Sequence, residues 1–287
     1  MKKLKLLLVI SLTFLMTGCF KQDDFENIKI YTTIYPVEYI VNYLYGEYSE
    51  ITSIYPNGVD VNNYELTNKQ IKDYSKMNLY VFNGKNDKES NYVTSIFKYN
   101  KNLKIIDATN TMEYNANDLE LWLDPSNFLM MALNIKNGIL EYTTNHYLNE
   151  KIEENYNNLK IEISKIDANL KLLYENTNNK TIVVDNDALK FLSKYGFNVI
   201  SLTDKDINDK TIIEVKSLIK SGNVDYIFTF DENNLSETAK NIKDTTSVKI
   251  KQLFKIDNLT GDMRNNKETY VTLLNENIDM LKDELYN

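Results

Sequence analysis

The chain has 287 residues, of which 43% are hydrophobic and 11% are aromatic, so it can bury a substantial core. Its 41 acidic residues outnumber its 33 basic ones and give a formal charge of −8, which argues against a nucleic-acid partner because that partner requires a basic face. With only 8 glycines and 3 prolines it is not a low-complexity chain, and its length suggests two lobes rather than one domain.

The N-terminus has the pattern of a bacterial secretion signal. Three lysines form a basic start, and the apolar run after them is too short to span a bilayer. The run ends in Met-Thr-Gly-Cys at Cys19, the only cysteine, which resembles a lipobox. We therefore predict a signal peptide at residues 1–18 and a lipid anchor on Cys19, with a polar tether over residues 19–27. An ordinary cleaved signal followed by an incidental cysteine is the alternative.

Removal of the signal takes away three lysines and no acid, so the formal charge becomes −11. No later stretch is apolar enough for a second membrane crossing. This acidic balance agrees with a soluble domain that a lipid holds at the extracytoplasmic face of the cell membrane.

Strand-like and helical patterns alternate in the first half of the chain. Short apolar runs predict strands at Ile28–Ile34, Ser49–Tyr55, Leu79–Asn83 and Leu103–Asp107. Helical patterns lie between them at Val37–Tyr45, Asn68–Met77 and Glu89–Tyr99. Thr67 and Gln70 have the spacing of a capping box, which marks the start of the second helix.

The middle of the chain predicts one long helix at Leu148–Glu175, about 40 Å long at 1.5 Å per residue. Its apolar residues recur at alternating steps of four and three, which forms a single seam. A coiled-coil dimer could use this seam, but three heptads inside such a chain more often pack on their own domain. His146, the only histidine, precedes the helix in a polar stretch, where we expect a surface residue.

The second half repeats the alternation. Strands are predicted at Thr181–Val184, Asn198–Leu202, Tyr226–Phe230 and Val248–Phe254, and the last helix at Glu268–Leu285. The chain is therefore predicted to be an α/β protein with two lobes of mainly parallel sheet wrapped by helices. We expect the lobes at residues 28–127 and 180–287, joined through residues 128–179 by the long rigid helix, with little hinge opening.

Six segments in order resemble the zinc- and manganese-type solute-binding lipoproteins of bacterial ABC importers. They are KIYTTIYPVEYIVNYLYG, ITSIYPNGVDVNNYELTNKQI, LYVFNG, ELWLDPSNFLMMALNI, DNDALKFLSKYGFNVISL and FKIDNLTG. The resemblance covers nearly all of the mature chain. It implies two lobes bridged by a rigid helix, a permease partner, and a metal ion as the transported ligand.

The resemblance also implies where the four metal ligands would lie. The family's first loop reads V-D-P-H-D-Y-E, and Asn62 stands here at the histidine. Its second motif reads D-P-H-[VI]-W-L-D-P, and Glu120 stands at that histidine. Asn186 occupies the third position, before the helix of H-D-A-F-x-Y, and Asp257 fits the fourth, an acid near the last strand. We expect these four residues to converge in the cleft between the lobes.

This set offers only oxygen donors. Zinc favours nitrogen and sulfur, whereas oxygen suits a harder ion, so Mn²⁺ or Ca²⁺ is more plausible than Zn²⁺ as the ligand. Each residue also has a plain structural explanation: Asn62 a turn, Glu120 a solvated charge, and Asn186 or Asp187 a helix cap.

An enzyme is not indicated, because the chain lacks a second histidine, a cysteine beyond the anchor and a phosphate-binding glycine loop. The sequence therefore predicts a monomeric, lipid-anchored solute-binding protein for divalent metal uptake. The alternative is a surface lipoprotein that keeps the fold for adhesion or another interaction and binds no metal.

Overall fold

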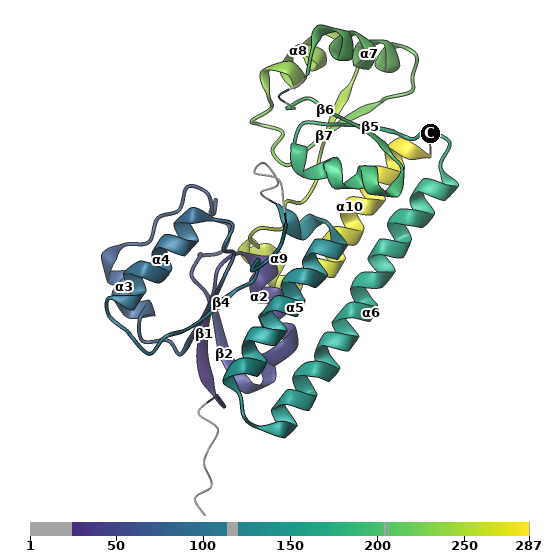
Figure 1. Ribbon diagram of the computed structural model, residues 1–287. Helices are drawn as coiled ribbons and strands as arrows, with labels where there is room; N and C mark the ends of the chain where they lie inside the picture. The colour runs from purple at the N-terminus through teal and green to yellow at the C-terminus, as the bar shows by residue number, and fades with distance from the viewer. Residues whose placement is uncertain (1–24, 114–119, 204, 206, 287) are drawn as a thin grey trace, which may run out of the picture.

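The computed structural model describes residues 25–113, 120–203, 205 and 207–286 (Figure 1). Cys19 and the predicted signal peptide lie outside these residues. Two four-stranded sheets form, one in each half of the chain, and every neighbouring pair of strands is parallel. This confirms the predicted α/β fold.

The two sheets have equivalent strand orders. The first has the order β2-β1-β3-β4, and the second has the order β6-β5-β7-β8. The strands are β1 (Ile28–Thr32), β2 (Ser49–Ser53), β3 (Leu79–Phe82), β4 (Lys104–Asp107), β5 (Thr181–Val184), β6 (Asn198–Ser201), β7 (Tyr226–Thr229) and β8 (Lys249–Gln252). All eight coincide with a predicted strand. β3 is buried along its whole length, as expected for a central parallel strand covered on both faces.

Helices cover both faces of the first sheet. They are α2 (Tyr35–Tyr45), the short 3-10 helix η1 (Gly46–Tyr48), α3 (Asn68–Tyr74), α4 (Asp87–Phe97), the 3-10 helix η2 (Leu121–Leu123) and α5 (Pro125–Tyr142). The capping box predicted at Thr67 and Gln70 is present at the start of α3. α3 and α4 lie on one side of the sheet, and α2 and α5 on the other (Figure 1).

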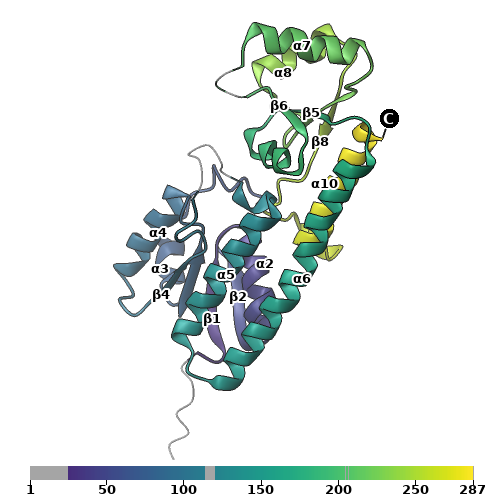
Figure 2. The ribbon, with the colours of Figure 1, turned by 45° about the vertical axis from the view of Figure 1, so that its right-hand side comes forward.

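The long central helix α6 (His146–Asn176) has 31 residues and spans about 46 Å. Its apolar seam is buried against α2, α5 and α10 (Tyr270–Leu285). Both views show α10 running beside α6 between the two sheets (Figures 1 and 2). The seam is therefore filled from within the chain and does not form a coiled coil with a second copy.

The remaining helices belong to the second half: the 3-10 helix η3 (Asp187–Tyr195), α7 (Asp209–Lys220), α8 (Glu237–Thr245) and α9 (Gly261–Asn265). α7 and α8 cover the outer face of the second sheet and share a small core with it. The other face joins a large core that continues along α6 and α10 into the first sheet. The lobes are thus connected through buried side chains as well as through the chain itself.

Among the described residues, no helix combines the length and the apolar character that a membrane crossing would need.

Candidate functional site

A cavity of about 260 Å³ opens at the carboxyl end of the first sheet. Ile34 follows β1 and Asn83 follows β3, so the cavity lies where ligands commonly bind in parallel α/β sheets. Segments from three other parts of the chain complete the wall. The lining residues are Ile34, Val61, Asn62, Asn83, Lys85, Asn86, Asp87, Glu120, Trp122, Lys255 and Asp257.

Three of the four residues singled out in the sequence line this cavity: Asn62, Glu120 and Asp257. Asn186 is not among the lining residues. It is the N-cap of η3, where its side-chain oxygen accepts a hydrogen bond from the Ala188 N–H at 2.8 Å. Its neighbours Asp187 and Ala188 line a second cavity of about 280 Å³, which Glu120 also borders.

Lys255 connects the two acids of the first cavity. Its Nζ lies 3.3 Å from Glu120 Oε1 and 3.0 Å from Asp257 Oδ2. The three side chains are mostly shielded from water, with exposed fractions of 9% for Glu120, 17% for Asp257 and 24% for Lys255. Sequence reasoning missed this lysine, although it stands two residues before the acid in the segment FKID.

The charges of this cluster depend on one another. Burial raises the pKa of Glu120, and the Lys255 ammonium opposes that rise. Burial alone would lower the pKa of Lys255. The charges and hydrogen bonds of Asp257 and Glu120 have a larger opposite effect and hold that pKa above its ordinary value. Lys255 therefore stays protonated at neutral pH and offsets one of the two carboxylates.

A strained residue lies between the lysine and the acid. Ile256 has a φ of 62°, in the left-handed region that β-branched residues rarely adopt. Such a conformation costs on the order of 1–3 kcal/mol and persists only where the surroundings enforce it. Its side chain is buried, which anchors it. Lys255 and Asp257, the residues on either side of Ile256, line the same cavity.

The loop that carries Asn62 is held by α4. Lys88 donates hydrogen bonds from Nζ to the carbonyl oxygens of Val61 at 2.6 Å, Asn62 at 3.0 Å and Tyr64 at 2.8 Å. Asp60 also accepts from the Asn62 N–H at 2.9 Å. Asn62 itself is exposed at the rim of the cavity, and these hydrogen bonds hold its backbone in place.

The segment after β8 is fixed to the first lobe by its backbone. The Tyr35 N–H donates to the Asp257 carbonyl at 2.8 Å, and the Gly58 N–H donates to the Leu259 carbonyl at 2.9 Å. Trp122 Nε1 donates to the Lys255 carbonyl at 2.8 Å. Residues 255–259 thus belong to the wall of the first lobe, although they follow the last strand of the second sheet.

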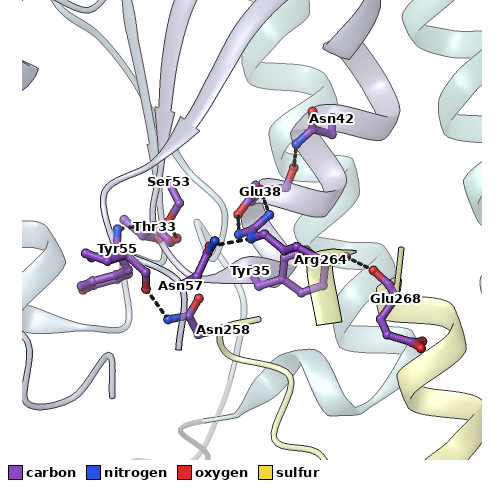
Figure 3. Close-up of polar contacts among 11 residues, drawn as sticks. Thr33, Tyr35, Glu38, Asn42, Ser53, Tyr55, Asn57, Asn258, Arg264 and Glu268 are labelled. Carbon is purple, nitrogen blue, oxygen red and sulfur yellow. Dashed lines mark hydrogen bonds and ion pairs between the residues drawn. The ribbon is translucent and has the colours of Figure 1, made fainter. Parts of the chain in front are cut away.

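A side-chain clamp reinforces this attachment (Figure 3). Arg264, the only arginine of the chain, makes a two-pronged ion pair with Glu38 of α2 at 2.7 and 2.8 Å, and donates to Asn57 Oδ1 at 2.6 Å. Asn258 donates to the carbonyls of Pro56 and Val59 at 2.8 and 3.0 Å. A planar guanidinium with two parallel hydrogen bonds fixes orientation as well as distance.

The donor set differs from an ordinary metal centre. Within the part of the chain that the structure describes, no group of three or more histidine, cysteine, aspartate or glutamate side chains is close enough to hold an ion. The only histidine, His146, is exposed at the start of α6 beside Glu150. Glu120 and Asp257 already share the ammonium of Lys255, so an ion could reach both carboxylates only if this ammonium left them.

The structure thus consists of two parallel α/β lobes joined by a long helix, with a polar cavity at the end of one sheet. The family described as "Zinc-uptake complex component A periplasmic" matches residues 30–284. The chain belongs to this family of metal-binding periplasmic components of ABC importers, which are not enzymes. The resemblance drawn from the sequence segments is thereby confirmed.

Solved structures agree on the fold. The metal-dependent lipoprotein YcdH of Bacillus subtilis has a TM-score of 0.74 and 19% identity over 91% of this chain and 100% of its own. The Zn(II)-bound ZnuA-like domain of Streptococcus pneumoniae AdcA has a TM-score of 0.73 and 19% identity over the same shares. The laminin-binding protein Lbp of Streptococcus pyogenes has a TM-score of 0.68 and 18% identity over 91% of this chain and 99% of its own.

Proposed function

We propose that this chain is the lipid-anchored, extracytoplasmic solute-binding component of an ABC importer, and that its solute is a divalent metal ion. The observation that carries the proposal is the meeting of Asn62, Glu120 and Asp257 around one cavity. These residues come from three distant segments, at the positions where the family resemblance implies ligands. Family membership supports the importer, and the permease is the expected partner.

The solute we propose is a hard ion such as Mn²⁺ or Ca²⁺ rather than Zn²⁺. The available groups are two carboxylates and a neutral amide oxygen, and Mn²⁺ and Ca²⁺ accept such oxygen ligands together with water. Zn²⁺ prefers nitrogen or sulfur, which the lining residues do not offer as side-chain ligands. Because few protein groups would coordinate the ion, we expect modest affinity, with binding at high micromolar concentrations of ion.

Thermal melting of the mature chain, with Cys19→Ser to keep it free of lipid, tests this proposal. We expect Mn²⁺ and Ca²⁺ at high micromolar levels to raise the melting temperature, because a ligand bound only by the folded state stabilises it. Glu120→Gln and Asp257→Asn should each remove the rise. Glu50→Gln, which alters an exposed carboxylate, should leave it unchanged.

Two outcomes would contradict the assignment. Zinc binding at nanomolar affinity would show that the oxygen donors named here are not the site. No stabilisation by any divalent ion would reject metal uptake as the function of this chain.

The pairing of Lys255 with both acids favours a second candidate, a surface lipoprotein that keeps the fold for interaction and binds no metal. The relative named as a laminin-binding protein is consistent with such a use of the fold. The melting experiment separates the two candidates, because only the metal transporter responds to ions.

A further inference from the structure

The cavity already contains a positive charge. The Lys255 ammonium lies about 3 Å from one oxygen of Glu120 and from one oxygen of Asp257. A Ca²⁺ or Mn²⁺ ion shared by the same two oxygens, at about 2.4 Å from each, would fill nearly the same space. An ion approaching from the opposite side would still lie within a few Å of the ammonium, in a site largely shielded from water.

The backbone of Lys255 cannot move aside easily. Its carbonyl accepts from Trp122, and the carbonyl of Asp257 accepts from the Tyr35 N–H. Arg264 fixes the same segment farther along through Glu38 and Asn57. Only the four-carbon side chain of Lys255 is left to swing out of the cavity, because both ends of its segment are attached to the first lobe.

We infer that Lys255 is a tethered counter-ion that competes with the transported ion and thereby sets the affinity of the site. This inference rests on the proposed function for its choice of ion. Binding is an exchange, in which the ion takes the two carboxylates as the ammonium leaves them. A tethered competitor acts at a high effective concentration, so the ion must displace a charge that never diffuses away.

The competition also determines which solutes bind. A monovalent cation gains no more from the two carboxylates than the ammonium already does, so it has no advantage in the exchange. A divalent ion interacts about twice as strongly with the same oxygens. The lysine therefore acts as a specificity-determining residue that selects for higher charge and keeps the affinity low.

The test compares Lys255→Met, which removes the charge but keeps a similar stem, with Lys255→Arg, which keeps the charge. Lys243→Met, at an exposed lysine of α8, controls for the loss of one surface charge. Trp122 is the only tryptophan and lines the cavity, so quenching of its fluorescence by paramagnetic Mn²⁺ reports binding at this site. Calorimetric titration with Ca²⁺ gives an independent affinity.

We expect Lys255→Met to bind Mn²⁺ and Ca²⁺ about 10- to 100-fold more tightly than the parent protein, as removal of a nearby like charge requires. Lys255→Arg keeps the positive charge and should therefore gain no affinity, and Lys243→Met should bind like the parent. Equal or weaker binding by Lys255→Met, with binding by the parent intact, would overturn the inference and leave the proposed function standing.

Two further outcomes separate the inference from the proposed function. Binding by Lys255→Met but not by the parent, up to 10 mM ion, would support Lys255 as the counter-ion and reject metal uptake by this chain. Binding by neither would reject both. If the two unpaired acids prevent Lys255→Met from folding, Lys255→Gln is titrated in its place, because its neutral amide can still donate a hydrogen bond to one of the acids. Lys255→Gln should bind more tightly than the parent, and equal or weaker binding would overturn the inference.

Discussion

Glu89 is a buried carboxyl group directly behind the cavity wall. Its Oε2 accepts a hydrogen bond from the Asn83 N–H at 2.9 Å, and its Oε1 accepts from the Tyr55 hydroxyl at 3.3 Å. Burial raises the pKa of Glu89 from 4.5 to about 7, and the hydrogen bonds only partly oppose the rise. In the unfolded chain the same group loses its proton near its ordinary value. The folded protein therefore binds one more proton than the unfolded chain between about pH 4.5 and pH 7.

This difference makes Glu89 a pH-dependent cost to stability. Because the folded state holds the extra proton, the contribution of Glu89 to the free energy of unfolding is most favourable below about pH 4.5. It falls as the pH rises and levels off above about pH 7. We expect Glu89→Gln, which resembles the protonated acid, to match the parent at pH 4.5. At pH 8 it should be more stable by about 3 kcal/mol at most.

Urea unfolding at a series of pH values measures the difference between Glu89→Gln and the parent. Glu50→Gln, at an exposed carboxylate, should show no such pH-dependent gain. A difference that is flat from pH 4.5 to pH 8 would mean that the Glu89 pKa is not raised by folding.

At the residue scale, short motifs located three of the four candidate residues near one another, while their role as metal ligands stays a prediction. Asn62, Glu120 and Asp257 stand in segments whose order and spacing match the family, and the structure brings them to one cavity. Lys255 and Lys88 were missed because a search for ligands considers groups with lone pairs, which a protonated lysine lacks. Their roles depend on distances between segments remote in the chain, which no local pattern records.

At the scale of elements, the seam of α6 contributes to stability through burial. Ile163 has no exposed surface, whereas Ile161, two residues away on the same helix, is 56% exposed. We expect Ile163→Ala to lower the free energy of unfolding by about 2–4 kcal/mol, from lost burial and a new cavity. Ile161→Ala should change it by less than about 0.5 kcal/mol, because the site is exposed and alanine suits a helix.

Chemical denaturation of the two variants checks this pair. Equal losses would show that α6 does not pack through the seam described here.

The strands and helices could be predicted because their signals are local. Alternation, apolar runs and the capping box at Thr67 each depend on neighbours within a few residues. The attachment of residues 254–265 to the first lobe could not be predicted in this way. It depends on contacts such as Arg264 with Glu38, which are 226 residues apart in the chain.

At the scale of the whole molecule, anchoring is the property that the sequence alone predicts, since Cys19 lies outside the described residues. We expect bacterial cells that produce the protein to retain it in the membrane fraction. Cys19→Ser should release it or leave it unprocessed, because the lipid is attached at that thiol. Fractionation followed by immunoblotting measures both. Full membrane retention of a normally processed Cys19→Ser protein would rule out the lipobox.

The attachment of the last segment to the first lobe has a consequence for the order of synthesis. The ribosome completes β1 to β4 well before it reaches Lys255, by on the order of ten seconds at usual rates of translation. During that interval Glu120 has no ammonium partner, and Phe128 lacks the ring of Tyr270 that stacks on it at 3.9 Å in the finished protein. The first lobe is therefore incomplete until the segment from Lys255 to the end of α10 has been made and packs against it.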